Sequence, residues 1–415
     1  MKINEKRLHD NLFELAKIGK NVNGGIDRAL GDETDGQARQ WLTVYWNEHL
    51  GIPVETDAIA NMWLTRKGSE QLAPIAIGSH HDAVPNGGMY DGALGVLMAT
   101  EIMETFKDNG YITRHPIKLV SFTGEEPNPF NVSTLGSKVL SGRLRKADLE
   151  KLKNKNDGSS LNDCIKKIGG DIEKADDALI KPGDIRAFIE CHIEQGKRLE
   201  KADISSCAVN CIIGIYRENV TIYGESNHAG TTLMAERHDA FLGASEFALA
   251  FEEAVNSMNR EDVVGTIGYV KVSPNASNII PGSVELSLEL RTVEPELKEE
   301  VLDKLTKACE KIEKHRGIKI ERKLNLDQRE MPMDKQVMDA VKRGIEAQGV
   351  KAVDLVSMAG HDAANMQRVT QAGMIFVKSI AGKSHCPEEY SEMKDIAVTA
   401  NAMLEAVLIL DKEMD

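Results

Sequence analysis

Short apolar runs recur along the chain, and each is followed by residues that can carry chemistry. They are PIAIGS at residues 74–79, IKLV at 117–120, and the first residues of RAFIECHIEQG at 186–196 and of GMIFVKSIAGKSHCPEEYSE at 373–392. A short apolar run bounded by turn residues predicts a strand buried on both faces. Residues 93–106, ALGVLMATEIMETF, instead have the apolar spacing of a helix. This alternation predicts an α/β fold with a mixed sheet flanked by helices.

The pattern changes near residue 212 and returns to α/β character from about residue 330. Between these points, alternating polar and apolar segments and two long helical segments follow one another in the order β-α-β-β-α-β. This order predicts a compact α+β sandwich of ferredoxin-like topology. We therefore expect a discontinuous catalytic domain, residues 1–212 and 330–415, into which residues 213–329 are inserted as a lid.

Composition excludes some classes of function without selecting one. The 415 residues are 41% hydrophobic and carry a formal net charge of -14. They can bury the cores of two domains, and they offer no basic stripe that would bind nucleic acid. The first 19 residues predict a charged amphipathic helix without a signal-type apolar core, and no apolar run reaches membrane-spanning length. Six cysteines without a pairing framework favour reduced thiols, so we expect a cytoplasmic protein with no membrane partner.

The segment GSHHDAVPNGGMYDGALG, residues 78–95, follows the first predicted strand. His80 lies where that strand ends, and Asp91 lies at the entrance of the predicted helix. Gly92 and Gly95 allow the backbone to pass close to its neighbours. Asp91 has two interpretations at this point: it caps the N-terminus of the helix, or it binds a metal ion together with His80.

The other strand ends carry further metal-binding side chains. Glu125 and Glu126 follow the second apolar run, His192 follows the third, and His385 follows the fourth. Strand ends of an open α/β sheet meet in one crevice, which favours a single shared site. Two divalent ions bridged by Asp91 fit this combined set of nitrogen and oxygen ligands: His80, Asp91, Glu126, His192 and His385. Zinc and manganese suit these ligands, and cobalt and nickel are further candidates.

The chain resembles the hydantoinase and carbamoylase branch of the aminoacylase and carboxypeptidase-G metallopeptidase clan over nearly its whole length. The blocks that carry the resemblance follow one another in the family's order: GSHHDAVPNGGMYDGALG, EEPNPFNVSTLGSKVL, ECHIEQG, ESNHAGTT with RHDA soon after, NIIPG, AGHDAANM and SHCPEE. The resemblance implies a di-metal, aminopeptidase-like catalytic domain. It also implies that the inserted domain mediates dimerisation.

The resemblance further implies a role for each ligand. Asp91 would bridge the ions, with His80 and His192 on one ion and Glu126 and His385 on the other. Glu125 would be the general base, which fits the chemistry because one glutamate of the pair binds metal while its neighbour stays free to move a proton. Asp82 would accept a hydrogen bond from the second ring nitrogen of His80 and fix its tautomer. His81 should point away, and no role is assigned to it.

The resemblance also assigns His228, in ESNHAGTT, to stabilisation of the tetrahedral intermediate. In the family this histidine reaches the active site of the partner subunit, so a homodimer would be required for catalysis. Arg291 offers a two-pronged donor for a substrate carboxylate, and Asn278 and Gln195 offer neutral amides. The alternative for Arg291 is a surface salt bridge with an acidic neighbour, for which the sequence offers Glu294 and Glu296.

The block SMAGHDAANM, residues 357–366, has two interpretations of equal weight. Main-chain amides around Gly360 and His361 would hold a substrate anion, or Asp362 would cap the helix that follows. The chain departs from the family pattern at five positions, none of them a proposed metal ligand: Ala83, Met89, Ala93, Leu233 and Met358. Met358 and residues 127–131 lie nearest the expected substrate side and therefore bear on the choice of substrate.

Together these features predict a metal-dependent amidohydrolase that acts on a small ureido or amide substrate carrying a carboxylate. The reaction we expect is cleavage of the ureido C–N bond of an N-carbamoyl-L-amino acid, or of a related ureido acid such as allantoate, with release of ammonia and carbon dioxide. The nearest alternative is an aminoacylase or dipeptidase of the same clan. A third interpretation, a metal-holding protein without catalysis, is disfavoured because binding alone needs no free base at Glu125.

Overall fold

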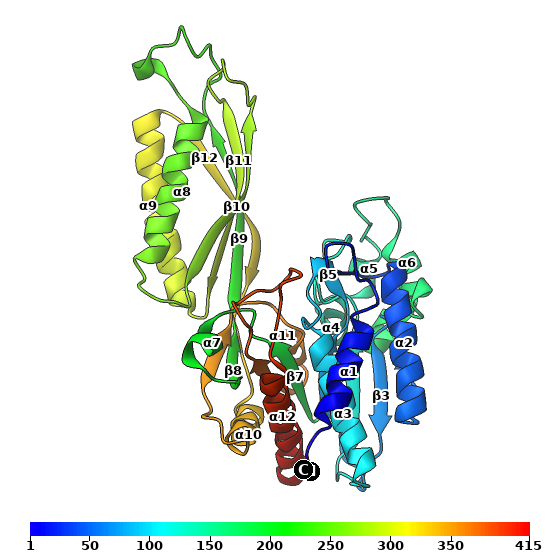
Figure 1. Ribbon diagram of the computed structural model, residues 1–415. Helices are drawn as coiled ribbons and strands as arrows, with labels where there is room; N and C mark the ends of the chain where they lie inside the picture. Colours follow the sequence, from blue (N-terminus) through cyan, green and yellow to red (C-terminus); the bar gives the residue numbers. More distant parts are fainter. The chain divides into compact units, whose positions relative to one another are not determined.

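The computed structural model describes residues 1–415. The chain forms two compact units (Figure 1): unit 1 consists of Met1–Asn210 and Met333–Asp415, and unit 2 of Cys211–Pro332. Unit 1 contains a large mixed sheet with helices, and unit 2 contains a separate four-stranded antiparallel sheet. The predicted α/β fold with an inserted α+β unit is therefore confirmed. That unit 2 serves as a lid and a dimerisation domain stays a prediction.

The centre of the large sheet is a run of parallel strands in the order β15-β7-β4-β6. These strands are β15 (Gln371–Val377), β7 (Ala187–Ile193), β4 (Ile75–His80) and β6 (Ile117–Phe122). Every residue of β4 and β7 is buried, as expected for strands covered on both faces. The apolar runs identified in the sequence therefore form the middle of the sheet.

Shorter strands extend this sheet on both sides. Beyond β6 lie β3 (Met62–Arg66) and β2 (Glu55–Thr56), and beyond β15 lie β8 (Ser206–Ile212), β13 (Met331–Pro332) and β14 (Asp354–Ser357). A separate ribbon pairs β1 (Ile26–Arg28) with β5 (Ala83–Gly87).

Helix α3 (Ala93–Asp108) packs on β4 and β7, and α12 (Met393–Glu413) and α10 (Lys335–Glu346) pack on β15. The remaining helices of unit 1 are α1 (Glu5–Leu15), α2 (Glu33–His49), α4 (Leu135–Leu140), α5 (Lys146–Leu149), α6 (Leu161–Lys167), η1 (Ile172–Ala178), α7 (Arg198–Ala202) and α11 (Ala363–Met366). No helix of the chain is both long enough and apolar enough to cross a membrane. All six cysteines are free thiols, as expected.

The strand order determines where the site forms. Because β4, β6, β7 and β15 are parallel, their carboxyl ends meet at one edge of the sheet. His80 is the last residue of β4, and His192 is the penultimate residue of β7. Glu125 and Glu126 follow β6 by a few residues, and the loop after β15 carries His385.

Unit 2 has the predicted chain order. Strand β9 (Gly214–Tyr223) is followed by η2 (Met234–Glu236), α8 (Ala240–Asn256), β10 (Val264–Ser273), β11 (Ser283–Thr292), α9 (Pro295–Arg316) and β12 (Lys319–Gln328). The strands pair antiparallel in the order β10-β11-β9-β12, which is ferredoxin-like. Both long helices lie side by side against the sheet, as Figure 1 shows.

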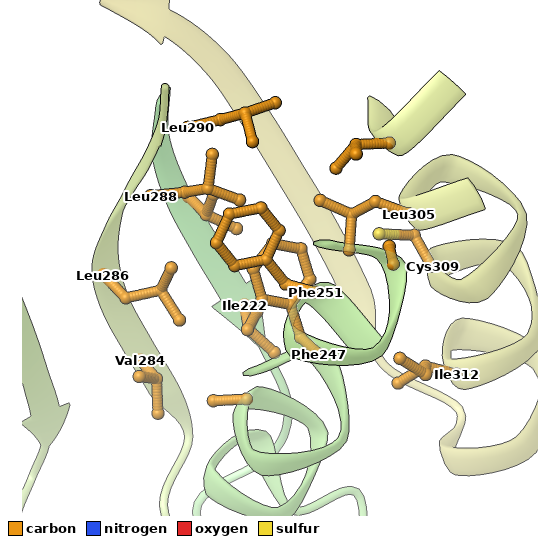
Figure 2. Close-up of a cluster of buried hydrophobic side chains, with 14 of the residues drawn as sticks. Ile222, Phe247, Phe251, Val284, Leu286, Leu288, Leu290, Leu305, Cys309 and Ile312 are labelled. Atoms are coloured by element: carbon orange, nitrogen blue, oxygen red, sulfur yellow. The ribbon is translucent and has the colours of Figure 1, made fainter. Parts of the chain in front are cut away.

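The core of unit 2 lies between these helices and the sheet (Figure 2). Phe247 and Phe251 of α8 point between leucines of β11 and apolar residues of α9. In β11 the buried positions alternate with more exposed ones, so only one face of this sheet contributes to the core. The two aromatic rings therefore fill the space between helix and strand.

Replacing Phe247 with Ala should destabilise unit 2 by about 3–5 kcal/mol, because the lost ring leaves a cavity in a fully buried position. Hydrogen exchange of unit 2 amides gives the free energy of opening without assuming that the whole chain unfolds in one step. Leu249→Ala on the same helix is the control, since Leu249 is 65% exposed and should change the opening free energy by less than about 0.5 kcal/mol. Equal effects of the two substitutions would contradict this account of the core.

Candidate metal centre

The carboxylate of Asp91 faces two groups of side chains, one with each oxygen. Its Oδ1 lies 3.5 Å from Nε2 of His80 and 3.2 Å from Nε2 of His192. Its Oδ2 lies 3.6 Å from Nε2 of His385. Asp91 makes no side-chain cap on α3, whose N-terminal cap is Gly92. The capping interpretation of Asp91 is therefore wrong.

Two triads of potential metal ligands share this aspartate. His80, Asp91 and His192 form the first, and Asp91, Glu126 and His385 form the second. In the second triad, Nε2 of His385 lies 3.4 Å from Oε1 of Glu126. The structure thus brings together all five residues that the sequence proposes as ligands. His385 differs from the others because its side chain is 47% exposed.

The two triads fit divalent ions by two independent observations. Nε2 of His80 and Oε1 of Glu126 are buried and have no hydrogen-bond partner in the protein, an arrangement that is costly unless another group satisfies them. Ligands about 2.0–2.1 Å from a tetrahedral ion lie about 3.3 Å from each other, which agrees with the 3.2–3.6 Å between the donor atoms here.

Buried negative charge at this sheet edge also favours cations. Seven carboxyl side chains of this region are buried: Asp82, Asp91, Glu125, Glu126, Glu190, Asp362 and Glu389. Burial raises the pKa of Glu125 and of Glu126 well above the usual value, and neighbouring acids raise both further. For Asp91, burial acts in the same direction but is outweighed by the imidazoles of His192 and His80, which hold its pKa well below the usual value. A bound cation would relieve the repulsion among these groups.

Asp82 connects the segment that contains His80 and Asp91 to Glu125 and Glu126. Its Oδ1 and Oδ2 accept hydrogen bonds from the backbone amides of Glu125 at 3.3 Å and Glu126 at 3.1 Å. Nδ1 of His80 lies 3.1 Å from the carbonyl oxygen of Asp82 and 3.4 Å from its Oδ1. Glu125 reaches the first triad without joining it, since its Oε2 is 3.8 Å from Nε2 of His80.

His81 points away from both triads. Its Nε2 donates to Oδ1 of Asp35 at 2.9 Å, and its Nδ1 is 2.6 Å from Oγ of Ser121. Arg28, also buried, donates from Nε to the carbonyl oxygen of His81. No sequence pattern pointed to Asp35 or Arg28, because both lie in distant segments that the fold brings next to His81.

His361 packs against the ring of His192. Its ring centroid lies 4.6 Å from that of His192, edge to face, and its Nε2 is 2.7 Å from Oγ of Ser357. Burial holds the pKa of His361 well below its usual value, so the ring is neutral near pH 7.

The helix after His361, α11, is not capped by Asp362. Glu190, not Asp362, caps α11: its Oε2 accepts from the backbone amide of Ala363 at 2.7 Å, whereas Asp362 makes no side-chain cap. Capping by Asp362 is therefore wrong. Substrate binding by Gly360 and His361 stays a prediction.

Gln195, for which substrate binding stays a prediction, contacts Asp91. Its Nε2 donates to Oδ2 of Asp91 at 2.7 Å and to Oγ of Ser384 at 3.1 Å. Gln195 and His385 both have backbone φ angles in the left-handed region, 57° and 56°. Such conformations are uncommon for residues other than glycine and concentrate at functional sites.

The remaining predicted site residues belong to unit 2. Nδ1 of His228 accepts hydrogen bonds from the amides of Gly230 at 3.0 Å and Thr231 at 3.2 Å, so a neutral His228 carries its proton on Nε2. The carbonyl of Asn278 accepts from the amide of Ala229, which places the His228 and Asn278 loops side by side.

Arg291 pairs with a different acid from the two that the sequence suggested. Its Nε donates to Oε1 of Glu289 at 2.7 Å, whereas Glu294 pairs with Arg260. Glu289 precedes Arg291 by two residues on the same strand, so the two side chains project from the same face of β11.

Comparison with known proteins gives one consistent result. Residues 76–409 match the model of Peptidase family M20/M25/M40. The chain is 34% identical over 406 residues to an N-carbamoyl-L-amino acid amidohydrolase of Geobacillus stearothermophilus, covering 98% of both chains. It is 33% identical to a ureidoglycolate hydrolase of Oryza sativa subsp. japonica, covering 94% of this chain and 81% of the relative. A crystal structure of a hydantoinase/carbamoylase family amidase from Burkholderia multivorans superposes with a TM-score of 0.90 at 31% identity, covering 98% of both chains.

Gly92 offers a test of the first triad. A Cβ at this position would lie 2.2 Å from Cε1 of His80, and the backbone φ is 61°. We expect Gly92→Ala to weaken zinc binding by the first triad at least about tenfold, because the ring of His80 must move. Competition against a chelator measures the affinity.

Gly110→Ala is the matched control for this experiment. Gly110 has nearly the same φ, 59°, but a Cβ there meets nothing within 4 Å. Gly110→Ala therefore also places a side chain at a positive φ, which L residues disfavour, but without the clash. Zinc affinity that falls equally in both variants would show that backbone strain, and not the position of His80, is responsible.

Proposed function

This chain belongs to peptidase family M20/M25/M40, among the hydantoinase/carbamoylase amidases, and from that premise we propose which reaction it catalyses. It hydrolyses the ureido C–N bond of an N-carbamoyl-L-amino acid or a related ureido acid such as allantoate, releasing ammonia and carbon dioxide. The observation that carries the proposal is the division of Asp91 between two ligand triads with Glu125 beside them. Relatives named for carbamoyl amino acids and for ureidoglycolate support a ureido substrate that carries a carboxylate.

We assign His80, Asp91 and His192 to one divalent ion and Asp91, Glu126 and His385 to the other. Zinc or manganese suits these ligands, with cobalt and nickel as further candidates. Ions bound there act as Lewis acids, which polarise the scissile carbonyl and make an attacking water more acidic.

Glu125 is the proposed general base. It stands outside both triads, and burial raises its pKa toward the range in which a carboxylate both accepts and returns a proton near neutral pH. It would take the proton of the attacking water and deliver it to the leaving nitrogen. Asp82 supports this role because it holds the backbone amides of Glu125 and Glu126.

The proposal assigns substrate contacts to residues of each unit. The Nε2–H of His228 donates to the oxyanion of the tetrahedral intermediate, and the two backbone amides on Nδ1 keep that proton in place. Arg291 binds the substrate carboxylate, and Asn278 and Gln195 hydrogen-bond its polar groups. Gly360 and His361 contribute on the side of unit 1.

We also propose that the active form is a homodimer in which His228 acts in the partner's site. Strand β10 is the last strand of its sheet and exposes apolar side chains, among them Tyr269 at 51% and Val270 at 52%. An exposed edge strand of ten residues with apolar side chains is a ready surface for pairing with a second copy.

A substrate panel tests the reaction. We expect ammonia from N-carbamoyl-L-amino acids or from allantoate, and no cleavage of N-acetyl amino acids or dipeptides, because only a ureido substrate has the terminal amide that leaves as ammonia. The alternative is an aminoacylase or dipeptidase, which the peptidase description of the family supports. Cleavage of N-acetyl amino acids or dipeptides with no ammonia from the ureido acids would replace our proposal by that alternative.

Hybrid dimers test the exchange of His228. Glu125→Gln alone should lower turnover by about 10²–10⁴ while metal content is kept, and His228→Ala alone by about 10²–10³. When the two variants are co-expressed with different affinity tags, a purified hybrid should recover about half of the wild-type turnover per dimer, because one of its two sites combines both intact residues. A hybrid as inactive as its parents would show that His228 acts within its own subunit.

A further inference from the structure

Glu389 is a buried, hydrogen-bonded acid near the second triad that neither triad includes. It lies in the loop that carries His385, and it is 4% exposed. Its Oε1 accepts from the backbone amides of Tyr90 at 2.9 Å and Asp91 at 3.0 Å. Its Oε2 accepts from Oγ of Ser384 at 3.0 Å. The side chain thus joins the loop of His385 to the segment of Asp91.

Glycine at position 88 makes this contact possible. A Cβ on Gly88 would lie 2.0 Å from Oε1 of Glu389, so the carboxylate packs directly against the backbone at this position. The rings of Tyr90 and Tyr390 also meet edge to face, with centroids 6.0 Å apart. Because His385 is on a loop rather than a strand, these contacts define its position relative to Asp91.

The hydroxyl of Ser384 has two acceptors within reach but only one proton. Its Oγ is 3.0 Å from Oε2 of Glu389 and also 3.0 Å from Oδ2 of Asp91. Oδ2 of Asp91 has two lone pairs, and Gln195 already donates to one of them at 2.7 Å. If Ser384 donated to Asp91 as well, no lone pair of Oδ2 would remain for a cation.

We propose that Glu389 is a positioning residue that accepts the proton of Ser384 and thereby leaves one lone pair of Asp91 Oδ2 free for the second ion. Backbone amides occupy its Oε1, so Oε2 is the only oxygen that can take this proton. The inference rests on the proposed two-ion site. It adds a residue that controls how tightly the second triad binds its ion.

The isosteric change Glu389→Gln reverses one hydrogen bond. The amide oxygen of the new side chain must face the two backbone N–H groups, so its NH₂ group faces Ser384 and donates to it. Ser384 then turns its own proton to Asp91 Oδ2. We expect zinc affinity of the second triad to fall by about 10–100-fold, while the first triad keeps its affinity, in titrations with Zn²⁺ alone followed by calorimetry and metal analysis.

Removing the hydroxyl should rescue the variant, which a merely structural role would not allow. In Glu389→Gln/Ser384→Ala no proton competes for Asp91, so zinc affinity of the second triad should return to within about threefold of the wild type. Glu388→Gln, an exposed neighbour, is the matched control and should leave both affinities unchanged. Unchanged affinity in Glu389→Gln, or no rescue in the double variant, would overturn the proposal.

Ser384→Ala alone supplies a measurement that does not depend on the folding of a Glu389 variant. Since Ser384 donates to Glu389 in the proposed arrangement, its loss should leave zinc affinity of the second triad nearly unchanged. A loss of tenfold or more would show that the Ser384 hydroxyl itself supports ion binding, and would overturn the proposed direction of the bond. Wild-type protein that binds a single Zn²⁺ would instead refute the two-ion site, which is a separate outcome.

Discussion

The carboxylate of Asp91 has to face two sets of ligands at once, and this constraint governs the local structure of unit 1. Its Oδ1 faces His80 and His192 at two strand ends, and its Oδ2 faces His385 on a loop. The backbone after His80 therefore turns back within eleven residues and enters α3 at Gly92. Only glycine leaves room for the ring of His80 at that turn. The parallel strands supply the other half of the constraint, because His192 meets Asp91 only if β4 and β7 are neighbours in register.

Because the carboxylates of this site are buried, positive charge stabilises their ionised forms. Carboxylates gathered at one sheet edge repel one another, and removal from water makes their ionised forms costly. The protein neutralises only part of this charge itself, through the imidazoles of His80 and His192 against Asp91. Other acids accept hydrogen bonds from backbone amides: Asp82 accepts from Glu125 and Glu126, and Glu190 caps α11. These acids shape the site through the backbone, whereas Asp91 and Glu126 belong to the two triads.

His80, Glu126, His192 and His385 could be proposed as ligands from the sequence because each follows an apolar run that had to become a buried strand, and parallel strands bring such ends together. The groups that position these side chains could not be predicted from the sequence. Glu389 bonds to amides nearly 300 residues away in sequence, and Asp35 meets His81 across two different elements, so no local pattern marks either. The two capping interpretations were wrong for one reason. Asp91 and Asp362 were interpreted through their sequence neighbours, whereas Gly92 is the N-cap of α3 and Glu190, from another strand, caps α11.

The two triads differ in how accessible they are to solvent. The first is enclosed, since His80, Asp91 and His192 are all nearly inaccessible, whereas His385 of the second is about half exposed. A ligand on an exposed loop loses more conformational freedom when it is fixed than one on a buried strand. The dense bonding around Ser384 and Glu389 is therefore placed where a loop most needs it. Among the five residues of the two triads, His385 alone is open to solvent, so the loop that carries it forms the accessible side of this cluster.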